Sequence, residues 1–434
     1  SSFVGRDSGP AWGRIMHSGG VLAQRRLRDV TQDKQRSFMT LLTTTAPAGS
    51  GPLTPAAPPL ESSPPLEVGP GGIFLRASTV DKKGGGSDDA PALLEVFRDD
   101  GELLASVSPP ADVHGKVLVD PTFSGATWSP DGRYVVYAAA LPKPKTKGFF
   151  DVKPPAPDAE DEFAFREDWG EAYTGTHAHS LFVLDVHTAT VHPVRGVPPT
   201  VAPGTPQLAP DGGVVYSGVE LGATRLGIVY CVNRPCGIYR APPESWQAAA
   251  DEQPAPEHEL LTRGMFLATS PRLAPAGDGV VFVGRRERFD THQTCLQLLH
   301  LPYPPPAGAE PRVVVDVVRS FDADSAWGGL YAAALPRRCF ASEDSVVLST
   351  PWGSRLGLTR VHLPTGGVSR VVPPLPPGAA AGELEGAGEW SAAVLDALPD
   401  GRVLCAHSSP RHPARHCLLA LGGGGELAGA SHGP

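Results

Sequence analysis

The chain has 434 residues, which is enough for two or three average domains or for one large repetitive domain. Glycine and proline contribute 50 and 48 residues, and the hydrophobic residues, 41% of the total, fall in short alternating runs, a composition typical of a turn-rich all-β protein. The net charge of −9 provides no basic surface for a phosphate backbone, so we expect no nucleic acid as a partner.

The apolar runs are far too short to span a bilayer, and no secretory leader opens the chain. Six cysteines scattered over a chain of this length are typical of reduced, mostly buried thiols. We therefore expect a soluble, cytoplasmic protein that does not bind membranes. Cys231 and Cys236 lack the spacing of a C-x-x-C motif, and a disulfide or metal site there is the less favoured interpretation.

The first residues differ in character from the rest of the chain. The sequence VLAQRRLRDVTQDKQRSF, residues 21–38, predicts a short Arg-rich helix, and residues 46–65 predict a Pro/Ala/Ser-rich linker. The Arg- and Ser-containing start, residues 1–36, is also compatible with a targeting peptide, and the sequence leaves this open.

From residue 66 onward, one pattern recurs six times: an apolar strand, a turn that resembles Ser-Pro-Asp-Gly, and a second apolar strand. Proline presets φ and Asp-Gly tolerates the backbone of a tight hairpin. A second hairpin-like segment follows each pattern, so that one repeat holds four strands. The turns lie at Pro70, Pro130, Pro210, Pro275, Ser342 and Pro399.

A four-stranded antiparallel unit that repeats every 57 to 80 residues is typical of a β-propeller blade. Ser37–Thr45 adds further strand-like sequence, and we predict an all-β propeller of seven blades, with six and eight as alternatives. The expected domains are an N-terminal helix and linker at 1–65, the propeller at 66–428 and a flexible tail at 429–434.

A long charged insertion, Leu141–His179, interrupts the second repeat and predicts a loop over one face of the propeller. Its segment FREDWGEAY predicts a recognition loop, because carboxylates can hold an amine or guanidinium while an indole supplies contact area. The alternative, which the sequence leaves open, is a loop whose tryptophan fills a groove and whose acids are solvated. The candidate residues are Arg166, Glu167, Asp168, Trp169 and Glu171.

Histidines offer weaker candidates. His412 and His416 could share a metal if they lay on a helix, but the prolines beside them favour a polar hairpin connection between two strands. His177 and His179 fit a solvated loop end as well as they fit catalysis. We predict no metal and no cofactor, since the phosphate-binding P-loop pattern is also absent from the sequence.

Residues 429–433 read GASHG and fit the G-x-S-x-G pattern of a serine nucleophile. Such a serine needs a buried strand before it and a helix after it, so that its hydroxyl stands above the sheet beside an oxyanion site. Glycine-rich sequence precedes this motif and only Pro434 follows it. We therefore interpret Ser431 as a tail residue, and no catalytic triad can be assembled from the spacing.

Several segments, including LEVFRDDGEL, FREDWGEAY, RLGIVYCVNRPCGIY and GGLYAAALP, occur in an order that resembles the N-terminal propeller of acylaminoacyl peptidases in the prolyl oligopeptidase clan. The resemblance covers about Leu66 to Leu421, and EDWGE near LGIVYCVNR is its most specific part. Enzymes of this family remove an N-acylated amino acid from a short peptide with a Ser-Asp-His triad on a C-terminal α/β-hydrolase domain.

The resemblance implies a substrate-gating and domain-docking module that is inactive by itself, because the hydrolase domain is absent from these residues. Its expected partners are that domain and short N-acylated peptides, and an oligomer is left open. The acids of the FREDWGEAY segment would pair with arginines of the hydrolase domain or form a negative rim that disfavours acidic peptides. The alternative function is a stand-alone propeller that binds another protein.

Overall fold

The computed structural model describes residues 7–29, 33–44, 52–62, 65–79, 92–119, 122–123, 125–142, 146–147, 160–161, 163–170, 173–228, 230–248, 254–320, 327–332, 334–374, 390–410, 412–422 and 427–432. The chain divides into two compact units. Unit 1 comprises Ser1–Gly72, Thr269–Arg286 and Gln293–Pro434, and unit 2 comprises Ile73–Ala268 and Glu287–His292.

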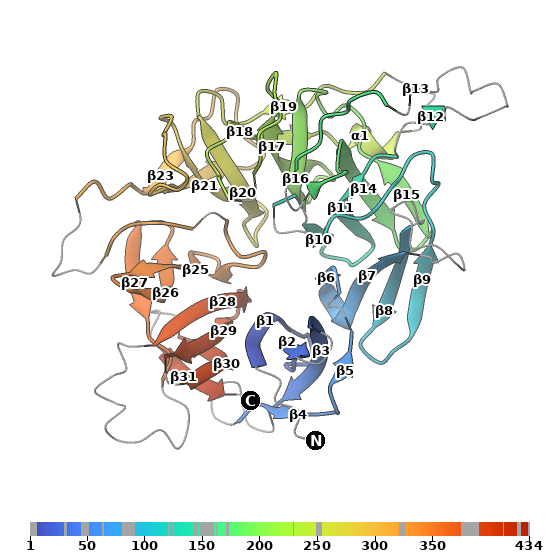
Figure 1. Cartoon of the computed structure of the whole chain (residues 1–434). Coiled ribbons are helices and arrows are strands. Elements are labelled where there is room, and N and C mark those ends of the chain that lie inside the picture. Colours follow the sequence, from blue (N-terminus) through green and yellow to red (C-terminus); the bar gives the residue numbers. More distant parts are fainter. Residues whose placement is uncertain are drawn as a thin grey trace. The chain divides into compact units, whose positions relative to one another are not determined.

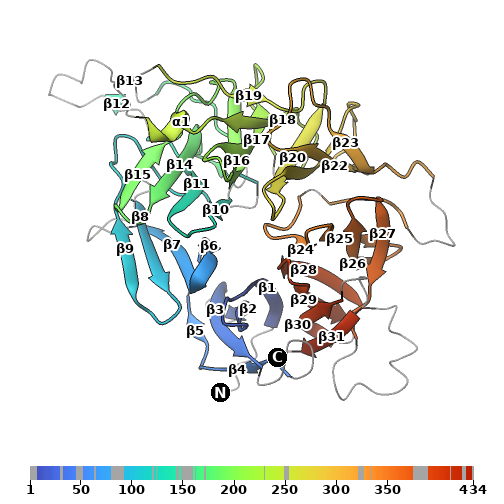
Figure 2. The ribbon, with the colours of Figure 1, turned by 180° about the vertical axis from the view of Figure 1, so that it is seen from behind.

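Unit 2 is built from antiparallel strands that pair with their neighbours in sequence, as both ribbon views show (Figure 1, Figure 2). One group is β7 (Ile73–Thr79), β8 (Ala92–Arg98) and β9 (Leu103–Val107). The next is a four-stranded sheet of β10 (Ala126–Trp128), β11 (Tyr134–Ala140), β14 (His179–Asp185) and β15 (Thr190–Pro193). The third is β16 (Val201–Leu208), β17 (Val214–Glu220), β18 (Cys236–Ala241) and β19 (Glu259–Leu260). The short strands β12 (Thr146–Lys147) and β13 (Glu160–Asp161) pair in parallel.

Unit 1 repeats the same organisation. It contains two four-stranded antiparallel sheets. The first consists of β24 (Phe340–Ser342), β25 (Ser345–Trp352), β26 (Arg355–His362) and β27 (Gly367–Val371). The second consists of β28 (Ser391–Ala397), β29 (Arg402–Ser409), β30 (His412–Leu421) and β31 (Leu427–His432). Strands β20 (Leu267–Leu273), β21 (Gly279–Arg285), β22 (Gln297–Pro302) and β23 (Arg312–Val315) follow one another in order. The N-terminal sheet holds β1 (Asp7–Ile15), β2 (Val21–Asp29), β3 (Lys34–Thr43), β4 (Thr54–Pro55) and β5 (Leu60–Glu61), and β6 (Glu67–Val68) comes after it.

The predicted Pro-Asp-Gly turns form, and the same contacts close them. The aspartate side chain accepts a hydrogen bond from the backbone N–H two residues later, which satisfies a donor inside the turn. The glycine takes a positive φ that side chains disfavour. These contacts are Asp131 to Arg133 (3.0 Å), Asp211 to Gly213 (2.9 Å) and Asp400 to Arg402 (3.1 Å), with φ of 72° at Gly132, 83° at Gly212 and 91° at Gly401.

One predicted hairpin is wrong. The segment CGIYRAPPESW supplies strand β18, but its second half forms the short helix α1 (Glu244–Gln247) directly after Pro242 and Pro243. Proline lacks an N–H and suits the first turn of a helix better than a sheet ladder. The Trp246 indole donates to the Gly212 carbonyl at 2.8 Å, which holds α1 against the preceding turn. Within the described residues, no helix is long and apolar enough to cross a membrane.

The predicted N-terminal helix is also wrong, because residues 21–29 form strand β2 between β1 and β3. Val21 and Ala23 are buried and alternate with the more exposed Leu22, the two-residue period of a strand. Their side chains pack in a core with Leu404 and Leu418 from the other end of the chain. Pairing with β1 and β3 and packing against these distant residues therefore override the helical propensity of the arginines.

Strand structure also extends into the predicted linker and tail. Strands β4 and β5 pair with β3, so residues 54–55 and 60–61 of the predicted linker belong to a sheet. The prediction of a flexible tail at 429–434 is wrong up to residue 432, because β31 pairs with β30 and Ser431 lies opposite Leu418. Ser37–Thr45 supplies most of β3, as expected from the sequence.

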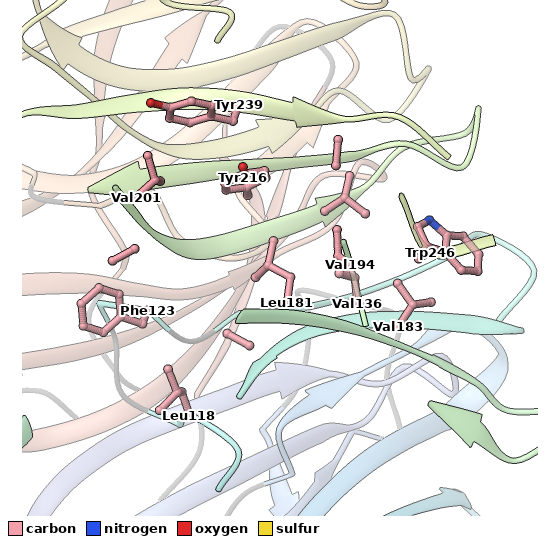
Figure 3. Close-up of a cluster of buried hydrophobic side chains, with 14 of the residues drawn as sticks. Leu118, Phe123, Val136, Leu181, Val183, Val194, Val201, Tyr216, Tyr239 and Trp246 are labelled. Atoms are coloured by element: carbon pink, nitrogen blue, oxygen red, sulfur yellow. The ribbon is translucent and has the colours of Figure 1, made fainter. Parts of the chain in front are cut away.

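The core of unit 2 is a continuous cluster of aliphatic and aromatic side chains (Figure 3). Tyr216 and Tyr239 lie on neighbouring strands with their rings stacked at 5.5 Å between centroids, and Leu181 lies beneath Tyr216 in this view. Burial of this kind contributes roughly 25 cal/mol for each Å² of apolar surface removed from water. The cluster therefore joins the sheet that contains β11 and β14 to strands β16, β17 and β18.

Unit 1 contains a buried network of ion pairs. The Arg14 guanidinium binds both carboxylate oxygens of Glu67, at 3.0 and 3.3 Å, and both side chains are only 5% exposed. Arg337 reaches the same carboxylate at 3.3 Å. Asp396, on β28, accepts hydrogen bonds from the Ile15 backbone N–H and from Arg338, both at 2.7 Å. Burial alone would raise the pKa of Glu67, but attraction from Arg14 and Arg337 lowers it from 4.5 to about 2.

We expect Glu67→Gln to lower the free energy of unfolding by about 3–5 kcal/mol, because Arg14 keeps its burial and loses its carboxylate partner. Urea denaturation measures this loss. The matched control is Glu102→Gln in the exposed pair with Arg98, which should change stability by less than about 1 kcal/mol.

The pH dependence separates charge from packing. The Glu67 carboxylate stabilises the fold fully above its unfolded pKa and loses this contribution as the pH falls through its folded pKa. The stability difference between the wild type and Glu67→Gln should therefore shrink between pH 4.5 and about 2. A difference that stays constant over this range would contradict the assigned ion pair.

Candidate functional site

The predicted recognition loop lies in unit 2, before strand β14. The structure describes residues 163–170 and 173–178 of it, and Glu171 lies outside the described residues. Arg166, Glu167 and Asp168 are half-buried, whereas Trp169 is buried. The tryptophan of this loop therefore points into the protein, and the three charged residues before it are only partly exposed to solvent.

Asp168 folds the loop on itself. Its carboxylate accepts hydrogen bonds from the backbone N–H groups of Gly170 at 2.9 Å and Gly175 at 2.6 Å, and these bonds lower its pKa. Both glycines have positive φ, 61° and 80°, in open space, so the backbone conformation rather than crowding requires glycine there. Asp168 thus acts as the internal cap of this loop.

Trp169 joins the core of unit 2. It is 4% exposed, and its ring lies 5.1 Å from Phe123, which also contacts Tyr173 at 5.3 Å. The Arg225 guanidinium stands over the indole, 5.2 Å from its centroid. Trp169 therefore packs in the buried cluster of unit 2.

Arg225 clasps this loop to the segment that precedes β18. Its backbone N–H donates to the Glu167 carboxylate at 2.6 Å, and its Nη1 donates to the Glu167 carbonyl at 3.1 Å and to the His177 carbonyl. Glu167 is thus hydrogen-bonded rather than solvated. The role of the loop in gating or docking remains a prediction.

The segment 221–235 connects β17 to β18, and its described residues, 221–228 and 230–235, form no strand. Hydrogen bonds from an arginine side chain hold this segment in shape. Arg234 donates from Nε at 3.1 Å and from Nη2 at 2.5 Å to the Gly227 carbonyl, and from Nη1 to the Asn233 carbonyl at 2.6 Å. Side-chain donors thereby satisfy carbonyls that a sheet ladder would otherwise bind. The motif LGIVYCVNR marked this segment in the sequence, but its spacing did not reveal a role for the arginines.

Unit 2 has a pocket of about 360 Å³ that Arg225 and Trp169 both line. This volume is at the small end of the roughly 300–1,000 Å³ typical of ligand sites. Aromatic and aliphatic side chains form much of its wall, and its charged residues are three arginines and one glutamate. The residues that matter most are Trp169, Phe266, Glu220, Arg225, Arg234 and Arg288. The lining therefore carries a net positive charge.

The remaining histidine candidates have structural positions. His179 is buried, against the expectation of a solvated loop end, and its Nε2 contacts the Pro203 carbonyl at 2.9 Å. His416 is buried within β30, and His412 stacks on Trp390 with 5.0 Å between ring centroids. The predicted hairpin between β29 and β30 forms, with Ser409 bonded to His412 at 3.0 Å. Among the described residues, no group of three or more His, Cys, Asp or Glu side chains could hold a metal ion.

Most of the cysteines are buried, and Ser431 lies in a strand. Five of the six cysteines are buried, as expected from the sequence, and none of the six forms a disulfide. Cys231 contacts Arg234 and Cys236 lies opposite Val219 in the sheet. Ser431 lies inside β31, whereas a nucleophile elbow requires a sharp turn between a strand and a helix.

Comparison with known proteins decides the family. The model of the acylamino-acid-releasing enzyme, N-terminal domain, matches residues 80–384. The chain belongs to this family. The acylamino-acid-releasing enzyme of Rattus norvegicus is 30% identical over 335 residues, which make up 73% of this chain and 42% of the relative. The chain thus spans less than half the length of this relative.

Solved structures show the fold of this acylamino-acid-releasing enzyme family member. The acylaminoacyl peptidase of Pyrococcus horikoshii aligns with a TM-score of 0.52 at 13% identity, over 95% of this chain and 51% of that one. The β-propeller domain of the Trilobed protease from Pyrococcus furiosus aligns with a TM-score of 0.50 at 10% identity, over 95% of both chains. The fold is therefore a β-propeller with four-stranded antiparallel blades, and the number of blades stays a prediction.

The burial of Trp169 predicts the effect of removing it. We expect Trp169→Ala to lower the free energy of unfolding by about 3–5 kcal/mol, because the cavity left in the core of unit 2 cannot fully close. Chemical denaturation provides the measurement. Phe165→Ala in the same loop is the matched control, because Phe165 is 90% exposed and its loss should change stability by less than about 0.5 kcal/mol. Equal effects of the two variants would contradict the position of Trp169.

Proposed function

We propose that this chain is the N-terminal propeller of an acylamino-acid-releasing peptidase and works with a C-terminal α/β-hydrolase domain that carries the serine triad. The observation that carries the proposal is the match of the family model to residues 80–384. In this role the propeller admits short N-acylated peptides and performs no bond cleavage of its own. The rat relative, which is more than twice as long as the matched segment, supports a further domain in the whole protein.

Exposed aromatic side chains make the loop before β14 a suitable docking element. Trp169 is committed to the core, but Phe163 and Phe165 in the same loop are 78% and 90% exposed. Large exposed apolar groups are favourable anchors in an interface because their burial removes them from water. In this proposal they supply the apolar contact, and Glu167 and Asp168 hold the loop that carries them through bonds to backbone N–H groups.

A stand-alone propeller that binds another protein is the less favoured function. Its support would be the same exposed loop without a hydrolase domain. The coding sequence downstream of Pro434 separates the two functions. We expect an in-frame α/β-hydrolase domain there, and a stop codon directly after Pro434 would favour the stand-alone propeller instead.

The chain of 434 residues should not hydrolyse acetyl-alanyl chromogenic substrates, because Ser431 lies within a β-strand and lacks the turn that a nucleophile needs. A continuous absorbance assay measures release of the chromophore. Wild type and Ser431→Ala should both show only the background rate. Turnover that the wild type displays and Ser431→Ala loses would refute this proposal and restore the serine as a nucleophile.

Docking can be measured with the hydrolase domain of the same gene product added in trans. We expect Phe165→Ser to weaken the complex by roughly tenfold or more, in keeping with the loss of an apolar anchor. Leu103→Ser on β9 is the matched control, because Leu103 is also an exposed apolar residue of unit 2 and lies outside the loop. Equal affinity of Phe165→Ser and wild type would rule out the loop as the docking element.

A further inference from the structure

The pocket of unit 2 combines cationic and aromatic groups in pairs. The Arg225 guanidinium lies 5.2 Å from the centroid of Trp169, and the Arg288 guanidinium lies 5.9 Å from that of Phe266. All four residues line the pocket. Such pairs hold a guanidinium over an apolar surface while its edge N–H groups can still donate.

Arg225 is fixed in place before any ligand arrives. Within the described part of the chain, the hydrogen bonds of its side chain all involve Nη1, which donates to two backbone carbonyls. The donors on Nε and Nη2 are therefore not used by these bonds. Because the two carbonyls and Trp169 already set the position of the guanidinium, a ligand that binds it pays little of the usual entropy for ordering a long side chain.

Arg288 is the accessible cation of the pocket. Its side chain is 78% exposed, and its contact with Asp290, which is also exposed, is a long one at 3.7 Å. A surface pair of this kind contributes little and competes weakly with a ligand. The Arg234 side chain, in contrast, donates to carbonyls of its own segment and so stabilises the wall of the pocket.

The chemistry of the wall selects the ligand. Val219, Leu221, Leu226 and Pro235 line the pocket beside the two aromatic rings, and Glu220 is its one acidic group among three arginines. A cation-lined pocket with apolar walls suits an anion that carries an apolar group next to its charge. Inorganic phosphate matches the charge but leaves the apolar walls without a partner.

We propose that this pocket binds the C-terminal carboxylate and the last apolar side chain of a short N-acylated peptide, an inference that rests on the proposed function. Acylation removes the charge of the peptide's α-amino group, so a peptide with neutral side chains carries its carboxylate as its one charge. A net positive pocket attracts such a ligand. The sign is opposite to that of the negative rim expected from the loop acids, because three arginines and one glutamate line the pocket and neither Glu167 nor Asp168 does.

The test is a titration of the full 434-residue chain with three ligands, in which ligand-observed NMR monitors binding. The ligands are acetyl-Ala-Ala-Leu as the free acid, the same peptide as its C-terminal amide, and inorganic phosphate. We expect the acid to bind about tenfold more tightly than the amide, as for the loss of one charge-assisted contact. Phosphate should not displace the bound acid at equal concentration. Equal affinity for acid and amide, or displacement by phosphate at equal concentration, overturns the proposal.

Variants locate the binding to the pocket. Arg288→Gln should weaken binding of the acid about tenfold and leave the amide unchanged, and its exposed position leaves the fold intact. Arg263→Gln is the matched control, because Arg263 is an exposed arginine of unit 2 that does not line the pocket. Equal effects of the two variants on the acid would place the binding elsewhere and overturn the proposal.

This result is independent of the test of the proposed function. Binding is measured on the propeller chain alone, whereas the proposed function depends on the coding sequence that follows Pro434 and on hydrolysis. A downstream hydrolase domain together with equal acid and amide binding would overturn the pocket and leave the proposed function standing. A stop codon together with selective acid binding would overturn the peptidase and retain a carboxylate site.

Discussion

The ion pair between Arg14 and Glu67 is the constraint on which unit 1 depends. Neither side chain reaches water to any extent, so the desolvation of each charge is offset by the other and by Arg337 nearby. Arg14 also donates to the Leu395 carbonyl, 381 residues away in sequence. The first strand is therefore fixed against a segment near the opposite end of the chain, and residues 7–29 belong to a sheet and not to a separate helix.

Local chemistry explains which parts of the fold could be predicted from the sequence. The Pro-Asp-Gly turns were predictable because each one satisfies itself: the aspartate binds a backbone N–H two residues on, and the glycine supplies the positive φ. The strand β2 was not predictable, because its arginines suggest a helix and its partners lie on β1, β3 and the distant Leu404 and Leu418. The packing of Val21 and Ala23 against residues near the other end of the chain leaves no signature in a short stretch of sequence.

The candidate site shows the same division. The motifs EDWGE and LGIVYCVNR marked the loop before β14 and the segment before β18 in the sequence. The contact between these two parts of the chain joins Glu167 to Arg225, 58 residues apart, and a motif does not reveal it. The sequence left two interpretations open: a recognition loop whose acids hold cationic groups, or a loop with solvated acids and a tryptophan that fills a groove. In the structure, the carboxylates bind backbone N–H groups and the indole fills the core, because an unpaired N–H in a half-buried loop is costly and a large ring gains most from burial.

Trp169 belongs to two environments at once, since one indole contacts Phe123 in the core and also lines the pocket under Arg225. A molecule that settles in the pocket therefore presses on a residue whose motion the hydrophobic cluster also governs. By thermodynamic linkage, a ligand that binds the folded pocket stabilises the closed cluster and opposes its slow opening. Hydrogen exchange at the backbone amides of the strands around Phe123 should therefore respond to occupation of the pocket.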